Sequence, residues 1–211
     1  YEIACRDWSS DVCSSDLSGG LSTRLSVAII MTHGDDQGLI LPPRLAPIQV
    51  VIVPIYKNAD EKARVMEVTD RVFKELKAAG IRLKVDDREE VTPGFKYNDW
   101  EMRGVPLRME IGPKDVEKGS VALARRDIPG RDGKTFVSQE NLAATVSEML
   151  VTIQAALLAK ATAFRDSNIH DPQDYEELKQ VVQNGWAFSY WCESKACEAK
   201  EIGRASCRER V

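Results

Sequence analysis

Apolar residues recur along the chain with two different spacings, and one of them is typical of strands. Residues 48–55 are almost continuously apolar and mostly β-branched, which predicts a strand buried on both faces. In residues 81–85 and 105–111, apolar side chains alternate with charged ones, which predicts strands with one apolar and one polar face. Residues 120–126 are a fourth candidate strand. These stretches together predict one central sheet.

The second spacing is helical. Residues 58–79 carry a single apolar stripe, with Asn58 and Glu61 as an expected capping box and Gly80 as the stop signal. A long amphipathic helix is expected from about residue 138. Because the first two strands flank a helix, we expect them to be parallel. The pattern therefore predicts an α/β fold with a mixed, largely parallel sheet flanked by helices.

Polar segments separate these elements. Residues 86–96 and 127–134 are rich in Asp, Gly and Pro or other polar residues, and they are predicted to be loops. A short helix is expected at residues 98–103. Another is expected to begin at Asp171–Asp174, because aspartate caps helix N-termini and proline fits the first turn.

The two ends of the chain do not resemble the middle. Residues 1–17 show neither a helical nor a strand period, and they lack the basic start and apolar run of a signal peptide. They resemble translated sequencing adapter, and residues 201–211 resemble the adapter from the other end of a library insert. We therefore leave both ends out of the fold prediction.

Composition narrows the class of protein. The net charge is −4, so any site for a polyanion has to be local. The middle of the chain offers no run of about 20 uninterrupted apolar residues, and we expect no membrane partner. Only two of the five cysteines lie outside the adapter-like ends. A disulfide framework is therefore not indicated, and a reducing, cytoplasmic location is expected.

Three stretches resemble prolyl-tRNA synthetases of the archaeal and eukaryote-like form. Residues 21–57 resemble the end of the class II catalytic domain running into the anticodon-binding domain. Residues 92–115 (TPGFKYNDWEMRGVPLRMEIGPKD) resemble that domain's most characteristic stretch, and residues 164–197 the extra C-terminal domain. The resemblance implies three parts: the end of the catalytic domain with motif 3 at 18–45, an anticodon-binding domain at 46–150, and the start of an α-rich C-terminal domain at 151–200.

The resemblance also implies an activity. Enzymes of this family activate L-proline with ATP and magnesium and transfer it to proline tRNA, and the full-length proteins are homodimers. The chain contains nothing that resembles motifs 1 and 2 of the catalytic domain. We therefore expect this piece to bind tRNA without aminoacylating it.

Two sets of candidate binding residues follow from the resemblance. Ser22, Thr23 and Arg24 match the motif 3 position, where a guanidinium suits the phosphate oxygens of ATP. The second set is expected to bind the anticodon, whose last two bases are guanines in proline tRNAs. A basic fork and a carboxylate can together discriminate guanine, and an aromatic ring can stack on an unpaired base. This set comprises Tyr97, Glu101, Arg108, Lys114 and, as a weaker candidate in the following loop, Lys134.

Two further motifs invite a metal site. Cys192 and Cys197 are spaced as half of a structural zinc site, which needs four ligands. Zinc is thus possible in a complete C-terminal domain, and two free thiols are the alternative. His33 is followed by Gly-Asp-Asp, but the chain has only two histidines, and a solvated loop is the favoured interpretation of residues 33–36.

Two other functions remain open from the sequence. The chain could be a free-standing anticodon-binding module without catalysis, although residues 21–45 argue against that reading. It could also be an unrelated doubly wound α/β domain for a small molecule. That fold favours a glycine-rich turn directly after the first strand, and residues 56–60 contain no glycine.

Overall fold

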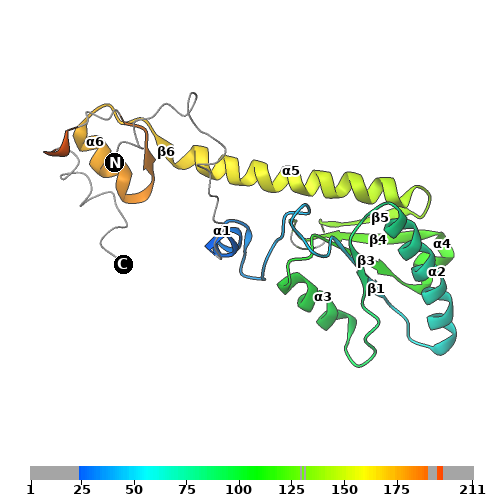
Figure 1. Ribbon diagram of the computed structural model, residues 1–211. Coiled ribbons are helices and arrows are strands. Elements are labelled where there is room, and N and C mark those ends of the chain that lie inside the picture. Colours follow the sequence, from blue (N-terminus) through cyan, green and yellow to red (C-terminus); the bar gives the residue numbers. More distant parts are fainter. Residues whose placement is uncertain (1–23, 129, 131, 190–193, 197–211) are drawn as a thin grey trace, which may run out of the picture.

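The computed structural model describes residues 24–128, 130, 132–189 and 194–196 (Figure 1). Its main elements belong to one α/β unit and a small C-terminal part. In chain order they are α1 (Arg24–His33), β1 (Val50–Pro54), α2 (Ala59–Ala78), β2 (Leu83–Val85), α3 (Pro93–Met102), β3 (Leu107–Ile111), α4 (Pro113–Lys118), β4 (Ser120–Arg125), β5 (Lys134–Ser138), α5 (Leu142–Asn168), β6 (Ile169–His170), α6 (Tyr175–Asn184) and β7 (Trp186–Ala187).

The central sheet has the strand order β2-β1-β3-β4-β5. Strand β1 pairs in parallel with β2 and β3, whereas β4 is antiparallel to both β3 and β5. Four strands therefore run in one direction and β4 alone runs in the other. This arrangement confirms the predicted mixed, largely parallel sheet and the parallel pairing of the first two strands.

Alternation along the strands separates two apolar clusters, one on each face of the sheet. On one face, Val50 and Ile52 of β1 pack in a large cluster with buried residues of α2 and α5. On the other face, Val51 and Val53 pack with Trp100 of α3. Figure 1 shows α5 and α3 on opposite sides of the sheet. Helix α3 covers only part of its face, which leaves the side toward β4 and β5 available for a site.

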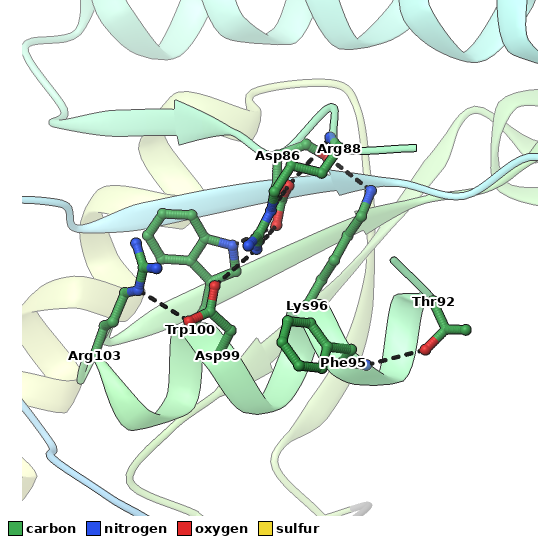
Figure 2. A network of polar contacts seen from close by, with 8 residues as sticks. All are labelled: Asp86, Arg88, Thr92, Phe95, Lys96, Asp99, Trp100 and Arg103. Atoms are coloured by element: carbon green, nitrogen blue, oxygen red, sulfur yellow. Dashed lines mark hydrogen bonds and ion pairs between the residues drawn. The ribbon is translucent and has the colours of Figure 1, made fainter. Parts of the chain in front are cut away.

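Helix α3 is fixed to the sheet by a buried carboxylate (Figure 2). Asp86 follows β2, and its side chain accepts hydrogen bonds from Trp100 Nε1 at 2.7 Å and from Arg88 at 2.6 and 2.8 Å. The backbone carbonyl of Asp86 also accepts from Lys96 Nζ at 3.1 Å. Arg88 extends the network to Asp99 of the same helix at 2.8 Å. The orientation of α3, and with it the position of its side chains, is thus set by one residue of the preceding loop.

Helix α5 extends beyond the sheet and carries the C-terminal part (Figure 1). Its first half packs on the sheet through five buried residues, Leu142, Val146, Leu150, Ile153 and Leu157. By length and composition alone it is the one helix in the described residues that could cross a membrane. At its far end, Phe164 stacks edge-on against Trp186, with ring centroids 6.1 Å apart. The helix passes without a break through residue 150, where the anticodon-binding domain was expected to end.

Several local predictions were wrong. Helix α3 begins at Pro93, inside the expected loop, because Thr92 Oγ1 accepts from the Phe95 amide and proline occupies the first turn. Helix α4 and strand β5 were not predicted, and Lys134 starts that strand rather than lying in a loop. Asn58 precedes α2 as expected but makes no side-chain capping bond.

Candidate nucleic-acid interface

Arg108 is the centre of the candidate site. It lies on β3, on the sheet face that α3 partly covers, and its guanidinium lies 4.0 Å from the ring centroid of Tyr97. Its NH1 donates to Glu101 Oε1 at 2.5 Å, and its Nε donates to Glu110 Oε1 at 3.1 Å. Two of these neighbours come from α3 and one from β3 itself. The network of Figure 2 therefore also determines where the guanidinium is held.

A second cation completes the cluster. Lys134 Nζ donates to Glu110 Oε2 at 2.6 Å, so the buried Glu110 carboxylate lies between Lys134 and Arg108. Burial, and then the negative charge of Glu110, raise the pKa of Tyr97 to about 12. At neutral pH the phenol is therefore protonated and can donate a hydrogen bond. The positive charges of Arg108 and Lys134 are balanced by the negative charges of Glu101 and Glu110. The cluster therefore presents directed donors and acceptors rather than net charge.

The strand register leaves room beside this cluster. Val51, Arg108, Ala124 and Lys134 pair in one row across β1, β3, β4 and β5. The β4 residue of this row is Ala124, whose side chain is only a methyl group. This face of the sheet is therefore not filled by side chains at β4. A cavity of about 600 Å³ lies there, within the range of ligand-binding pockets. It is lined by residues that include Val51, Tyr97, Glu101, Arg108, Ala124, Arg125 and Arg126, together with Gln37 from the turn after α1.

One lining residue of the cavity, Gln37, comes from the turn that follows α1, outside the sheet. Arg126 is buried directly after β4, and its two terminal nitrogens donate to the carboxylate of Asp35 at 2.6 and 2.9 Å. These bonds hold the pKa of Asp35 below its usual value. Residues 33–36 are therefore more than the solvated loop that was expected, since one of their carboxylates anchors the turn to the sheet.

The structure brings together four of the five residues predicted to bind the anticodon. Tyr97, Glu101 and Arg108 line the cavity, and Lys134 joins them through Glu110. Lys114 is exposed in the first turn of α4, a helix that contacts α2 and β4. In the described part of the chain, no hydrogen bond or ion pair joins Lys114 to that cluster.

The other predicted site residues lie at or beyond the limits of the described residues. Ser22, Thr23, Cys192 and Cys197 fall outside them, and of Arg24 only its place as the first residue of α1 is described. Among the described residues, no three His, Cys, Asp or Glu side chains group so as to hold a metal ion. The ATP and zinc assignments therefore stay predictions.

Sequence reasoning missed three residues of the site. Glu110 was taken as part of a charged strand face, yet it is buried and bridges two cations. Its position two residues after Arg108 was the available signal, since both then share a face of the strand. Gln37 and Arg126 gave no such signal, because their place in the site depends on contacts between segments far apart in the sequence.

Comparison with known proteins identifies the family of the domain that holds this cavity. Residues 49–149 match the family described as the anticodon binding domain. The proline–tRNA ligase of Roseiflexus castenholzii is 59% identical over 174 residues, which cover 82% of this chain and 36% of that protein. The corresponding enzyme of Chloroflexus aggregans is 52% identical over 193 residues, covering 90% of this chain and 40% of its own length.

A solved structure supports the same assignment. The Cryptosporidium parvum prolyl-tRNA synthetase complexed with L-proline and AMP superposes with a TM-score of 0.80 at 37% identity, covering 87% of this chain and 40% of that one. The chain thus spans well under half the length of the relatives it matches. Sequence and fold together show that this chain belongs to the prolyl-tRNA synthetase family, of which it carries the part that contains the anticodon-binding domain.

Proposed function

We propose that this chain supplies anticodon recognition to a proline–tRNA ligase. The whole enzyme would activate L-proline with ATP and transfer it to proline tRNA. The proposal rests on the position of Arg108. Its guanidinium is held between Glu101, Glu110 and Tyr97 in a cavity of the matched domain. A guanidinium held in this way is preorganised, so little side-chain entropy is lost when a base binds.

The cluster has the chemistry that guanine requires. Guanine presents two acceptors, O6 and N7, on one edge and donors on its Watson–Crick edge. Arg108 uses one N–H group on each carboxylate and has others to donate to the acceptors. The partly exposed carboxylate of Glu101 can accept from the donors, and the ring of Tyr97 can stack on an unpaired base. Adenine and the pyrimidines lack this combination of donors and acceptors.

The remaining parts of the activity rest on the family resemblance. Ser22, Thr23 and Arg24 would bind ATP with magnesium in the complete enzyme, and Cys192 and Cys197 would contribute to a zinc site only with further ligands. The Cryptosporidium structure was determined with L-proline and AMP, which supports the use of ATP. Assembly into homodimers belongs to the full-length enzyme. One relative is a chloroplastic/mitochondrial enzyme of Arabidopsis thaliana, so a cytoplasmic location stays a prediction.

The two alternative functions are not favoured. A free-standing anticodon-binding module would match its relatives over residues 49–149 alone, yet the match to the Roseiflexus ligase extends over 174 residues. A doubly wound small-molecule domain would have a parallel sheet, whereas β4 is antiparallel to both its neighbours.

The proposal is tested by binding of the chain to an RNA hairpin that carries the anticodon loop of proline tRNA. A second hairpin has both anticodon guanines replaced by adenines, and the salt concentration is fixed because phosphate contacts alone support affinity. We expect a preference of about 1 kcal/mol or more for the guanine hairpin, which Arg108→Ala abolishes. Arg64→Ala removes an exposed arginine of α2, on the other face of the sheet, and should keep the preference. Equal binding of the wild-type chain to both hairpins would contradict the proposal.

A further inference from the structure

The Asp35 carboxylate joins the turn that follows α1 to the end of β4 and also bonds within the turn. Asp35 accepts two hydrogen bonds from the buried Arg126, and its Oδ1 also accepts from the backbone amide of Gln37 at 2.9 Å. Backbone bonds of 2.9 and 3.1 Å between Asp35 and Gly38 close the turn as a small hairpin. The position of Gln37 relative to the sheet is therefore set by Asp35 and Arg126.

The same turn is packed directly on the C-terminal end of α3. Gly38 has a φ of +135°, and a Cβ there would lie 2.7 Å from Met102 Cα and 3.1 Å from the Glu101 carbonyl oxygen. The Glu101 carbonyl also accepts a long hydrogen bond of 3.5 Å from Arg126 Nε. The turn thus contacts the backbone of a residue whose side chain binds Arg108.

Gln37 extends from this anchored turn to the cavity. It is exposed, and it lines the same cavity as Glu101 and Arg108 although it lies more than sixty residues earlier in the sequence. A glutamine amide carries both a donor and an acceptor, which is a common means of contacting base edges. A guanine whose O6 and N7 edge meets Arg108 presents two kinds of donor away from that edge, N1–H and the 2-amino group. Glu101 can accept from N1–H, and Gln37 offers a second acceptor for the 2-amino group.

We propose that the turn at residues 35–38 is a second wall of the anticodon site, and that the Gln37 amide oxygen accepts from the 2-amino group of a bound anticodon guanine. Asp35 and Arg126 are positioning residues, which act by holding Gln37 at the cavity. This inference rests on the proposed function and adds to it a specificity-determining residue from outside the anticodon-binding domain matched at 49–149.

The test uses hairpins in which each anticodon guanine is replaced in turn by inosine, which lacks only the 2-amino group. Gln37→Ala should weaken binding of the guanine hairpin about five- to tenfold and leave binding of one inosine hairpin unchanged. Asp35→Asn should cause a similar loss on the guanine hairpin. In the double variant the loss should be no larger than in Gln37→Ala, because Asp35 acts through Gln37. Asp36→Asn, the neighbouring carboxylate of the turn, is the matched control and should bind like wild type.

Two outcomes would overturn the inference. One is that Gln37→Ala weakens no hairpin, or weakens the guanine hairpin and both inosine hairpins by the same factor. The other is that Asp35→Asn weakens all hairpins equally while thermal unfolding shows a destabilised chain, which is the signature of a merely structural role. If Arg108→Ala abolishes the guanine preference but Gln37→Ala does not, only this inference fails. If wild type shows no guanine preference, the proposed function fails as well.

Discussion

At the scale of single residues, Asp86 shows how a buried charge can organise a site that it does not touch. Burial on its own would raise the pKa of this carboxyl, but hydrogen bonds from Arg88 and Trp100 outweigh that cost and lower the pKa to about 2. Breaking a buried pair leaves the remaining partners unsatisfied and is strongly destabilising. Because these partners fix α3, Asp86 supports the positions of Tyr97 and Glu101 from a distance.

The first prediction concerns the stability that this carboxylate contributes. We expect Asp86→Asn to lower the free energy of unfolding at pH 7 by about 2 kcal/mol. The folded-state pKa lies below the unfolded value near 3.8, so the contribution is present above that value and is lost as the pH falls toward about 2. The difference between wild type and variant should therefore shrink from pH 5 to pH 3, as measured by urea unfolding.

A neighbouring carboxylate provides the control for this prediction. Asp87 is exposed next to Asp86, so Asp87→Asn should change the free energy of unfolding by less than about 0.5 kcal/mol. If Asp86→Asn kept a constant deficit from pH 5 to pH 3, the carboxylate would not be the titrating source of the stability.

Residues that contact each other directly in the site were named from the sequence only within one stretch of the chain. Glu101 and Arg108 lie seven residues apart, and the family resemblance named both as anticodon-binding candidates in a stretch whose pattern predicted a helix followed by a strand. Asp35 and Arg126 lie 91 residues apart, and periodicity carries no information about which charged residues meet at that separation. The residues of the first pair were therefore named together, from the resemblance, and those of the second pair were missed.

At the scale of elements, the contact between the turn and α3 depends on the absence of a side chain. Gly38 adopts a φ that L-residues rarely adopt, and its Cα faces the backbone of Met102. Gly80 also has a positive φ, at +78°, but no atom lies within 4 Å of a Cβ built there. A substitution at Gly80 therefore tests backbone strain alone, whereas a substitution at Gly38 tests strain together with close packing.

We predict that Gly38→Ala costs clearly more than Gly80→Ala. Strain alone should cost about 1 kcal/mol at Gly80, which follows α2. At Gly38 the strain adds to a clash with backbone that has no flexible end to move aside, so we expect about 2 kcal/mol or more. Urea unfolding of both variants measures the difference. Equal costs would mean that the turn moves away from α3 freely, and that the docking contact is weak.

Elements were predicted well where one face is buried and less well where they are short. The apolar stripes of α2 and α5 and the alternation of β3 gave clear periods. Helix α4 is only six residues long, and β5 has mostly exposed side chains, so neither shows enough of a pattern to be separated from a turn. The start of α3 was missed because its first turn contains Pro93-Gly94, which was taken as a loop signal although proline is favoured there.

At the scale of the whole molecule, the basic residues have two different expected roles, base recognition inside the site and attraction to phosphates outside it. The chain is acidic overall, and Arg108 and Lys134 are each paired with carboxylates in the site. Such a site contributes specificity through directed bonds, whereas attraction to phosphates has to come from cations outside it. Lys114 is exposed on α4 and lies apart from the cluster, so it suits the second role.

We therefore predict that Lys114→Ala weakens binding of the guanine hairpin and of its substituted counterpart by the same factor. The slope of log K against log salt should fall in magnitude by about 0.7–0.9, the value for one lost phosphate contact. Lys118→Ala, at the other end of the same helix, should leave the slope unchanged. A loss of guanine preference in Lys114→Ala at constant slope would instead place this lysine against a base. The RNA would then have to follow β3 past its end to α4, and the anticodon site would extend beyond the cavity beside Arg108.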